Sequence, residues 1–590
     1  MTPYDRPHQP DPVGEPHQPD PHDRPHQPRS GRGSRRPGLP VGFRIRLDAG
    51  ARRTDDGLVL VGGTPLRVLR LRPSGRAWLD RLAAGEPIPN EPTARGLARH
   101  LVDSGAAHPE PSWPTPVPTV AVVIPVRDDS AGVRRLLASV LVHRQAAASA
   151  AAPDPVQWPA ATRIPVPARA PAARRPVPAQ IVVVDDGSAD PDAVSAAAGD
   201  AAGWPGSDPT RVDVVRHRTS RGPAAARNHG ATLVRSDLVA FLDADVEVSE
   251  GWLAPLVAHF TDPLVGAVAA RVTARHQPAA PVSPTAAFRQ PVTLIAAFRR
   301  LATSAASFHQ PATLAMFDAA RSPLDLGPAA SPVRPGARVP YVPSAALVVR
   351  RSALADVGGF DPDLVVGEDV DLVWRLGQSG WTVRYEPAAV VTHRVRPDLR
   401  TWLRQRFRYG TSAAMLARRH PNALAPVRVS LWSAVAWAAV ALGATTTGAA
   451  VAAATSAALV PRLHGLRHPA REAVRLAGGG HLAAGAALAE AARRPWWPVT
   501  LAAAAVWPRI RPAAAVALLV PPLRRWAATR PAGLGPAAWL ALHLADDVAY
   551  GAGVWSGCLR LRTIAPLVPD LSDWPGRRRA VEHVAEPARR

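Results

Sequence analysis

Residues 239–246 read VAFLDADV, an apolar run that ends in two acidic residues separated by one alanine. A short, continuous apolar run is typical of a strand buried on both faces of a parallel sheet. Side chains two residues apart point to the same side of an extended chain, so Asp243 and Asp245 are expected to lie side by side. Paired carboxylates suit a hard divalent cation and a ribose. The stretch therefore predicts a buried strand with such a site at its end.

Similar runs occur upstream, with VAVVIPV at 120–126, IVVVDDG at 181–187 and VDVVRH at 212–217. Because these runs alternate with helical stretches, they predict an α/β domain, which we place at residues 118–412. Ligands of open α/β sheets bind at the carboxyl ends of the strands. The Ala- and Pro-rich stretch 146–179 within this domain is interpreted as a disordered surface insertion.

Polar side chains lie at the ends of two further strands. Pro125, Arg127 and Asp128 stand at the end of the first run, and Asp185 stands at the end of the second. A single acid in such a place is explained by capping of the following helix. Two acids in register favour a pocket for a polar ligand, since a carboxylate accepts hydrogen bonds from a base edge or a ribose.

The segment 221–230 reads RGPAAARNHG, which predicts a short loop that leads into a helix. Its small residues allow a ligand to approach the backbone, and Arg221 and Arg227 can meet a diphosphate. A charge on the surface of the helix is the alternative for Arg227.

Three acids open a predicted helix in GEDVD at 367–371. Acids in a first helical turn are favoured electrostatically, so capping is the alternative here too, but three exceed what a cap requires. Asp369 is predicted to be the general base that removes a proton from an acceptor hydroxyl, and Glu368 is predicted to position that acceptor.

His393 and the segment 404–410 complete the candidate site. His393 ends an apolar run in VVTHR, where a neutral imidazole can complete a metal shell; a structural histidine is the alternative. Gln405 and Arg408 lie in RQRFRYG, which we expect either to close over the donor or acceptor or to lie on lipid phosphates.

The chain before the α/β domain has two parts. Residues 1–39 repeat a Pro-His-Gln-Pro unit with almost no apolar side chains, which predicts a disordered tail. Residues 40–112 begin with FRIRLD at 43–48 and GLVLVG at 57–62, which predict a hairpin, and continue with two amphipathic helices. This pattern predicts a small, winged-helix-like α+β domain, for which peptide binding and a purely structural role are both open.

The C-terminal part, 425–565, is rich in Ala, Val, Leu and Trp, and 33 uncharged residues separate Arg428 from Arg462. About 20 apolar residues span a bilayer, and tryptophan favours its interface. We expect an apolar helical, membrane-associated region followed by a tail at 566–590. This places the protein at the cytoplasmic membrane with its catalytic domain facing the cytoplasm; a soluble Ala-rich helical domain is the alternative.

The net charge of +23 comes entirely from arginine, because the chain contains no lysine. Such an excess favours nucleotide phosphates and an anionic membrane surface as partners. Zinc-ligand spacing, an aromatic RNA-binding signature and a concentrated basic helix are all missing from the sequence, so we expect no nucleic acid partner. The single cysteine, Cys558, excludes an intrachain disulfide and a Cys-rich metal site.

The ordered motifs resemble those of family-2 glycosyltransferases with the GT-A fold. The motifs are IPVRDD, VVVDDGS, GPAAARNHG, FLDADV, GGFDPDL with VVGEDVDLVWRL, THR and QRFRYG. The resemblance implies that Asp128 and Asp185 contact the nucleotide, that Asp243 and Asp245 hold the sugar nucleotide and Mg²⁺ or Mn²⁺, and that Asp369 is the base. It also implies inversion at the anomeric carbon.

Three more stretches are similar to the glycosyltransferases of the mycofactocin system: SPLDLG at 322–327, VPYVPSAALVVRRSAL at 339–354 and HLADDVAYGAGV at 543–554. This resemblance implies transfer of glucose from a UDP-glucose-type donor to a small redox cofactor derived from a ribosomal peptide. A family-2 enzyme of cell-envelope polysaccharide or glycolipid synthesis is one alternative. A binding protein that only senses the donor is another.

Overall fold

The computed structural model describes residues 36–54, 57–149, 176–202, 211–274, 311–394, 398–421, 423–463 and 466–571. The predicted N-terminal tail, the predicted insertion at 146–179 and the predicted C-terminal tail lie mostly outside these residues. All contacts reported below are within the single unit formed by residues 38–590.

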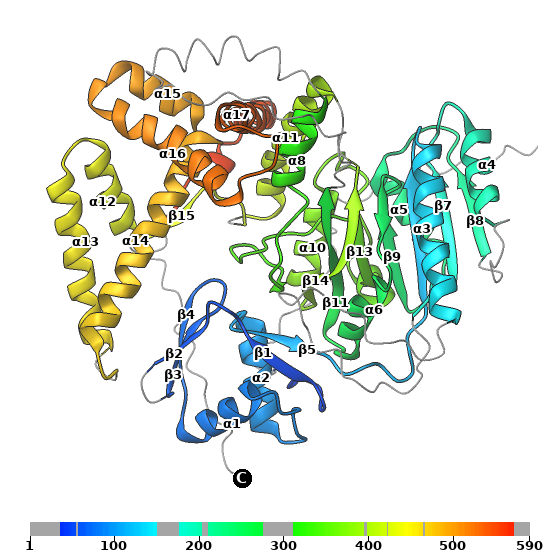
Figure 1. The fold of residues 1–590 in the computed structure, drawn as a ribbon, viewed down its shortest axis with the longest axis horizontal. Helices are drawn as coiled ribbons and strands as arrows, with labels where there is room; N and C mark the ends of the chain where they lie inside the picture. The colour runs from blue at the N-terminus through cyan, green and yellow to red at the C-terminus, as the bar shows by residue number, and fades with distance from the viewer. Residues whose placement is uncertain are drawn as a thin grey trace, which may run out of the picture. The chain divides into compact units, whose positions relative to one another are not determined.

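A mixed sheet of nine strands, counted among the described residues, forms the centre of the molecule (Figure 1). The predicted runs form four neighbouring parallel strands in the spatial order β9-β6-β7-β8. Their bounds are β6 (Val120–Val126), β7 (Gln180–Asp185), β8 (Arg211–Arg216) and β9 (Leu238–Leu242). The predicted α/β domain with a parallel strand core is thus confirmed.

The other half of the sheet contains antiparallel pairs that the apolar runs did not predict. Strand β13 pairs antiparallel with both β9 and β11, and β14 pairs parallel with β11 and antiparallel with β10 and β12. Their bounds are β10 (Val246–Val248), β11 (Val265–Ala274), β12 (Ser331–Pro332), β13 (Ala346–Arg350) and β14 (Thr382–His393). The pairing of β10 with β14 brings His393 beside the predicted cation site.

Helices cover both faces of this sheet. Val122 and Ile124 of β6 pack into one core, while Ala121 and Val123 pack into the other, as the alternation of a strand requires. The first core includes α3 (Ser130–Ser149), α4 (Pro191–Ala202) and α6 (Leu253–Ala258), which is followed by η2 (His259–Thr261). The second includes α5 (Pro223–Thr232), α9 (Arg351–Asp356) and α10 (Glu368–Gln378).

A small α+β domain precedes the sheet, as predicted, but its strands pair differently. The strand from FRIRLD pairs antiparallel with β5, whereas the strand from GLVLVG lies between β2 and β4. The bounds are β1 (Arg44–Leu47), β2 (Arg52–Thr54), β3 (Val59–Gly62), β4 (Arg67–Arg70), α1 (Pro73–Ala83), α2 (Pro92–Ser104) and β5 (Ala107–Glu110). Peptide binding by this domain stays a prediction.

Buried ion pairs join this small domain to the sheet. The guanidinium of Arg99 donates two hydrogen bonds to Asp262, at 2.7 and 2.9 Å, and both side chains are buried. Arg338 donates to the buried Asp48 at 2.9 Å. Bidentate arginine–carboxylate pairs fix orientation as well as distance, so the two parts are held in one arrangement.

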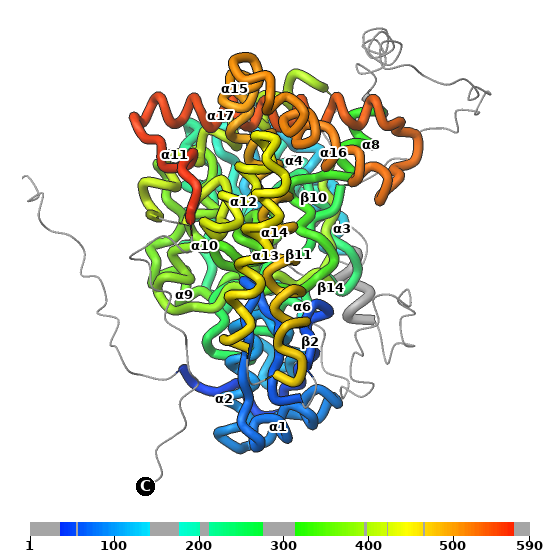
Figure 2. Tube along the Cα trace, turned by 90° about the vertical axis from the view of Figure 1, so that its left-hand side faces the viewer, coloured from blue at the N-terminus to red at the C-terminus, as the bar shows by residue number. Residues whose placement is uncertain are grey.

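The C-terminal part is helical, and α12, α13 and α14 pack side by side (Figure 2). Two further helices, α8 (Pro311–Arg321) and α11 (Leu399–Arg419), lie between the sheet and this part. The remaining elements are β15 (Arg428–Val429), α12 (Leu431–Ala441), α13 (Thr445–Leu459), η4 (Val460–Leu463), α14 (Pro469–Arg493), α15 (Trp497–Val506), η5 (Pro508–Ile510), α16 (Arg511–Thr529), α17 (Pro536–Arg560), η6 (Ala565–Leu567) and β16 (Asp570–Leu571).

The predicted location at the cytoplasmic membrane is wrong, because none of the described helices is long and apolar enough to cross a bilayer. The uncharged stretch between Arg428 and Arg462 is divided into α12, with 11 residues, and α13, with 15. A turn at Gly443, with φ of 89°, separates them. The tryptophans also serve the fold: the indole of Trp437 donates to the carbonyl of His481 at 2.7 Å.

Candidate active site

The first part of the candidate site is the edge formed by the ends of β6 and β7. The backbone N–H of Asp128 donates to Oγ of Ser188 at 2.9 Å, and Oδ1 of Asp128 accepts from the N–H of Ala189 at 2.8 Å. These bonds tie the two strand ends together and leave the Asp128 side chain 52% exposed. Pro125 lies within β6, and Arg127 donates from Nη1 to Ser220 at 3.1 Å. This edge therefore presents an accessible carboxylate.

Asp185 is placed differently from Asp128. Its side chain is only 2% exposed; Oδ1 accepts from the N–H of Ser188, and Oδ2 accepts from Arg216, both at 2.9 Å. Both oxygens therefore already have partners within the protein. Of the two acids predicted to contact a nucleotide, Asp128 is the one that the structure leaves open to a ligand.

Asp186 is a member of the site that the sequence analysis did not single out. Its buried carboxylate accepts from the backbone N–H groups of Arg221 and Gly222, each at 2.8 Å, and from Ser220 and His217, each at 2.7 Å. Burial alone would raise the pKa of Asp186, but these donors outweigh it and lower that pKa below its ordinary value. The carboxylate fixes the loop before α5. The sequence signal for Asp186 is that it is the second acid at the end of a buried strand.

Arg227 links two groups of the predicted site. Nη2 donates to Asp243 at 2.7 Å and Nη1 donates to Glu368 at 2.8 Å, and the guanidinium lies 5.3 Å from the ring centroid of Phe360. Its residue is only 4% exposed; burial acts to lower its pKa, yet the two carboxylates raise it. Arg227 thus joins the DxD strand end to the helix that carries the predicted base. Arg221 remains exposed at the loop.

Asp243, Asp245 and His393 come together as the sequence predicts. His393 donates from Nε2 to Oδ2 of Asp245 at 3.0 Å. Burial lowers the pKa of His393, but the adjacent carboxylate outweighs it and raises that pKa. Both aspartate side chains are about one-third exposed.

Among the described residues, no three His, Cys, Asp or Glu side chains gather closely enough to form a complete metal site. Asp245 and His393 nevertheless fit a divalent cation, since carboxylate and imidazole both ligate Mn²⁺ and a donor phosphate can supply the remaining oxygens.

Asp369, the predicted base, lies in the first turn of α10. Gly367 precedes this turn with φ of 88°, and a Cβ on it would lie 3.1 Å from Ser412 and Leu416 of α11. The carboxylate accepts from its neighbour's N–H, at 2.8 Å, and from Ser344 N–H, at 3.3 Å. Burial, together with the negative charge of Glu368, raises the pKa of Asp369 to about 7. A base with that pKa is well matched to neutral conditions.

The third acid of this turn, Asp371, has a structural role. It is fully buried and accepts from Arg375, Arg419 and His420 at 2.7, 3.0 and 2.9 Å. Burial alone would raise its pKa, but these donors lower the pKa of Asp371 to about 2. The three acids of GEDVD thus have three environments, and Asp371 serves to join α10 to the end of α11.

The segment RQRFRYG forms part of α11. Gln405 donates to the phenol oxygen of Tyr409 at 2.7 Å, and Arg408 is exposed. The side chain that enters the interior is Arg406, which bonds to Asp318 and Asp546. In the part of the chain that the structure describes, Gln405 and Arg408 have no hydrogen bond or ion pair with Asp369 or Asp245. The acceptor role of Gln405 and Arg408 stays a prediction.

Comparisons with known proteins identify the family of the chain. The model of the family "Glycosyl transferase family 2" matches residues 173–321. The chain is 35% identical over 548 residues to the pre-mycofactocin glycosyltransferase of Mycobacterium tuberculosis, a match that covers 90% of this chain and 98% of that protein. It is also 44% identical over 84 residues to the succinoglycan biosynthesis protein ExoU of Rhizobium meliloti, which covers 14% of this chain and 22% of that protein.

Among solved structures, a mannosyltransferase from Pyrobaculum calidifontis, in complex with GDP-mannose and Mn²⁺, is similar with a TM-score of 0.37 and 18% identity. The match covers 75% of this chain and 88% of the mannosyltransferase chain. The family assignment rests on the match to the mycobacterial protein, which spans nearly the whole of both chains. The chain belongs to the family-2 glycosyltransferases of the mycofactocin system.

Proposed function

We propose that this glycosyltransferase transfers glucose from UDP-glucose to pre-mycofactocin, with inversion and with the help of Mn²⁺ or Mg²⁺. The observation that carries the proposal is the chain of contacts from the base to the cation edge. Asp369 follows Glu368 directly, Glu368 accepts from Arg227, and Arg227 donates to Asp243. The acceptor name comes from the mycobacterial relative. The sugar and the stereochemical outcome are those that the family resemblance implies.

The donor would lie along the carboxyl ends of the parallel strands. The exposed carboxylate of Asp128 is available to the nucleoside, and Asp243 is available to the hydroxyl groups of the ribose. Asp245 and His393 would hold the cation, which neutralises charge on the departing diphosphate. The sugar would thus stand with its anomeric carbon toward the turn that carries Asp369.

Transfer then needs one base. Asp369 accepts the proton of the acceptor hydroxyl, whose oxygen bonds to the anomeric carbon while the bond from that carbon to the diphosphate oxygen breaks. Attack on the side opposite the departing diphosphate inverts the configuration. Arg227, held by Asp243 and Glu368, keeps the two halves of the site in register.

The direct test is to incubate the protein with UDP-glucose, Mn²⁺ and pre-mycofactocin and to follow UDP release and acceptor mass. We expect one or more hexose units on the acceptor and loss of transfer when EDTA is added. A donor panel with GDP-mannose and UDP-N-acetylglucosamine serves as the control for the sugar. UDP-glucose turnover absent under all metal conditions would overturn the proposed reaction, and undiminished transfer in EDTA would overturn the proposed cation.

A further inference from the structure

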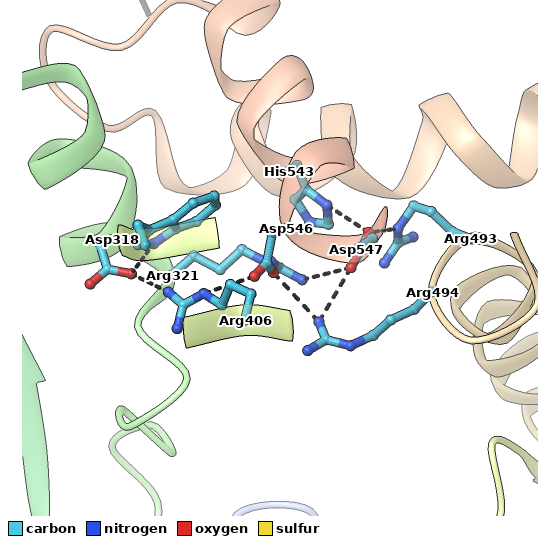
Figure 3. Close-up of polar contacts among 9 residues, drawn as sticks. Asp318, Arg321, Arg406, Arg493, Arg494, His543, Asp546 and Asp547 are labelled. Atoms are coloured by element: carbon cyan, nitrogen blue, oxygen red, sulfur yellow. Dashed lines mark hydrogen bonds and ion pairs between the residues drawn. The ribbon is translucent and has the colours of Figure 1, made fainter. Parts of the chain in front are cut away.

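A buried charge cluster joins four helices (Figure 3). We call it the ADD cluster, after the Ala-Asp-Asp sequence at its centre. Asp547 of α17 is fully buried and accepts from Arg494 at 3.2 Å and from His543 at 3.1 Å, as well as from Arg493. The cluster consists of Asp318 and Arg321 from α8, Arg406 from α11, Arg493 and Arg494 at the end of α14, and His543, Asp546 and Asp547 from α17.

Packing of α11 places the ADD cluster near the site. This helix carries Arg406 of the cluster, and its Ser412 and Leu416 lie against Gly367, two residues before Asp369. Tyr341 lies within reach of the charges of Asp369, Arg494 and Tyr550. Tyr341 belongs to the same segment as Ser344, whose backbone N–H donates to Asp369. The C-terminal helices therefore lie close to the segment that contacts the base.

Helices α11 and α17 pack closely against each other because glycines face each other at their crossing. A Cβ on Gly410 would lie 2.1 Å from the carbonyl oxygen of Tyr550, and one on Gly553 would lie 2.0 Å from that of Phe407. Only glycine leaves space for backbones at such separations. The close crossing fixes the position of Tyr550 on α17 relative to the helix that covers Gly367.

Arg494 is fixed by the cluster yet keeps hydrogen-bonding capacity. Its Nη1 donates to Asp547 and lies 3.5 Å from Asp546, and its guanidinium stacks 4.0 Å from the ring centroid of Tyr550. Its side chain is 23% exposed, and no described residue accepts from its Nε or Nη2. The remaining N–H groups are thus available to a ligand.

Two phenols share this property. Among the described residues, none forms a hydrogen bond with the hydroxyl group of Tyr341 or of Tyr550, and both residues are partly exposed. Burial and the charge on Tyr550 raise the pKa of Tyr341 to about 12, so its phenol remains a proton donor near neutral pH. Both hydroxyls are therefore open to water or to a ligand.

We propose that Tyr341, Arg494 and Tyr550 form the acceptor subsite of this enzyme, and that they bind hydroxyl or carbonyl oxygens of the acceptor next to Asp369. The inference rests on the proposed function and deepens it. The set consists of hydrogen-bond donors with one cation and no carboxylate, so it favours a neutral or anionic, oxygen-rich acceptor over a cationic one.

The subsite explains the sequence HLADDVAYGAGV. Asp547 and Tyr550 are three residues apart, so they lie on one face of α17. Asp547 holds the charge of Arg494, while Tyr550 receives the flat side of the same guanidinium. The two glycines that follow Tyr550 allow close packing against α11 and the end of α14. Within this motif, Asp547 anchors Arg494, Tyr550 orients its guanidinium, and the two glycines allow the helix contacts.

The test is steady-state kinetics with UDP-glucose and pre-mycofactocin on Tyr341→Phe, Tyr550→Phe and the double variant. Each substitution removes one hydroxyl and keeps the ring. We expect the KM for pre-mycofactocin to rise about two- to tenfold for each, as a lost hydrogen bond predicts, with the KM for UDP-glucose and the slow hydrolysis of UDP-glucose by water unchanged. Arg494→Lys should also raise the acceptor KM, because lysine keeps the charge but loses the planar stack.

The matched control is Tyr385→Phe, which removes a hydroxyl that donates to the carbonyl of Gly327 away from Asp369. It should leave the acceptor KM at the wild-type value. An unchanged acceptor KM in the Tyr341→Phe/Tyr550→Phe double variant, with wild-type transfer intact, would overturn the acceptor subsite alone. A wild-type protein that neither transfers nor hydrolyses UDP-glucose would overturn the proposed function and the subsite together.

Discussion

The donor edge, formed by the carboxyl ends of the parallel strands, and the proposed acceptor subsite, which we also call the acceptor wall, are built in opposite ways. At the donor edge, Asp128 and Asp243 follow the ends of buried strands, so the local sequence that forms each strand also places the side chain. The acceptor wall combines Tyr341 from the segment before β13 with Arg494 and Tyr550 from the C-terminal helices. Its geometry depends on a buried network of charges that are far apart in the sequence. Donor recognition at the sheet and acceptor recognition at the wall can therefore be altered independently.

Asp369→Asn should give the largest effect, because it removes the base where the two regions meet. We expect kcat to fall by about 10²- to 10⁴-fold, the usual contribution of a positioned base. Calorimetry should show unchanged binding of UDP-glucose, since Asp369 has no role in the donor edge. Asp363→Asn, an exposed acid nearby, is the control. A variant that keeps more than a tenth of wild-type kcat would remove Asp369 from the role of base.

Asp547→Asn should weaken the acceptor wall through stability. Arg321, Arg493 and Arg494 would then share a buried cluster that lacks one negative charge, and breaking such a buried pair costs about 3–5 kcal/mol. Urea denaturation measures the loss in the free energy of unfolding.

The control for that measurement is Asp80→Asn, which breaks an exposed pair with Arg53 and should cost less than about 1 kcal/mol. Equal losses in the two variants would show that the ADD cluster contributes no more than a surface ion pair.

The pH dependence of transfer should report on Asp369. Because only the deprotonated carboxylate accepts a proton, kcat/KM should fall about tenfold per pH unit below about pH 7 and level off above it. Glu368→Gln removes the neighbouring negative charge that raises this pKa, so the inflection should move to lower pH. The charge of Arg227 lowers the pKa of Asp369, so a change at Arg227 would also move the inflection. Binding of UDP-glucose, measured at each pH, is the control for such a change. An inflection that stays in place or moves upward in Glu368→Gln would contradict this account.

Arg408→Gln should have the smallest effect. Arg408 is exposed, whereas Arg406, two residues away, is buried in the ADD cluster. We expect Arg408→Gln to change the free energy of unfolding by less than about 0.5 kcal/mol, as is usual for surface substitutions. Thermal unfolding of Arg406→Gln, measured in the same way, gives the stability loss with which Arg408→Gln is compared. A loss for Arg408→Gln as large as that for Arg406→Gln would show that the exposed arginine also has a buried role.

The sequence predicted the parts of the fold and site that local patterns determine. The four parallel strands follow from continuous apolar runs, and the contact of Asp245 with His393 follows from two strand ends at one edge. The role of Asp371 was not distinguishable from that of Asp369, because both are acids in one helical turn. Only the packing of α11 against α10 separates them, by bringing Arg419 and His420 to Asp371.

The failures have a common physical cause. An uncharged stretch of 33 residues suggested a membrane span because composition does not reveal where a helix ends, and the turn at Gly443 divides it. The diphosphate contact of Arg227 stays a prediction, but the sequence did not predict its two carboxylate partners, which lie 16 and 141 residues away. Long-range pairing of charges in the interior is set by the assembled fold.

Two-substrate kinetics of Asp128→Asn beside the Tyr341→Phe/Tyr550→Phe variant tests the division of labour most directly. Asparagine keeps Oδ1 as the acceptor for the N–H of Ala189 and removes only the charge at the donor edge. We predict a rise of about tenfold in the KM for UDP-glucose for Asp128→Asn alone, and a rise in the KM for pre-mycofactocin for the double variant alone. If both variants raise the KM of the same substrate, donor and acceptor recognition are not divided between these two regions.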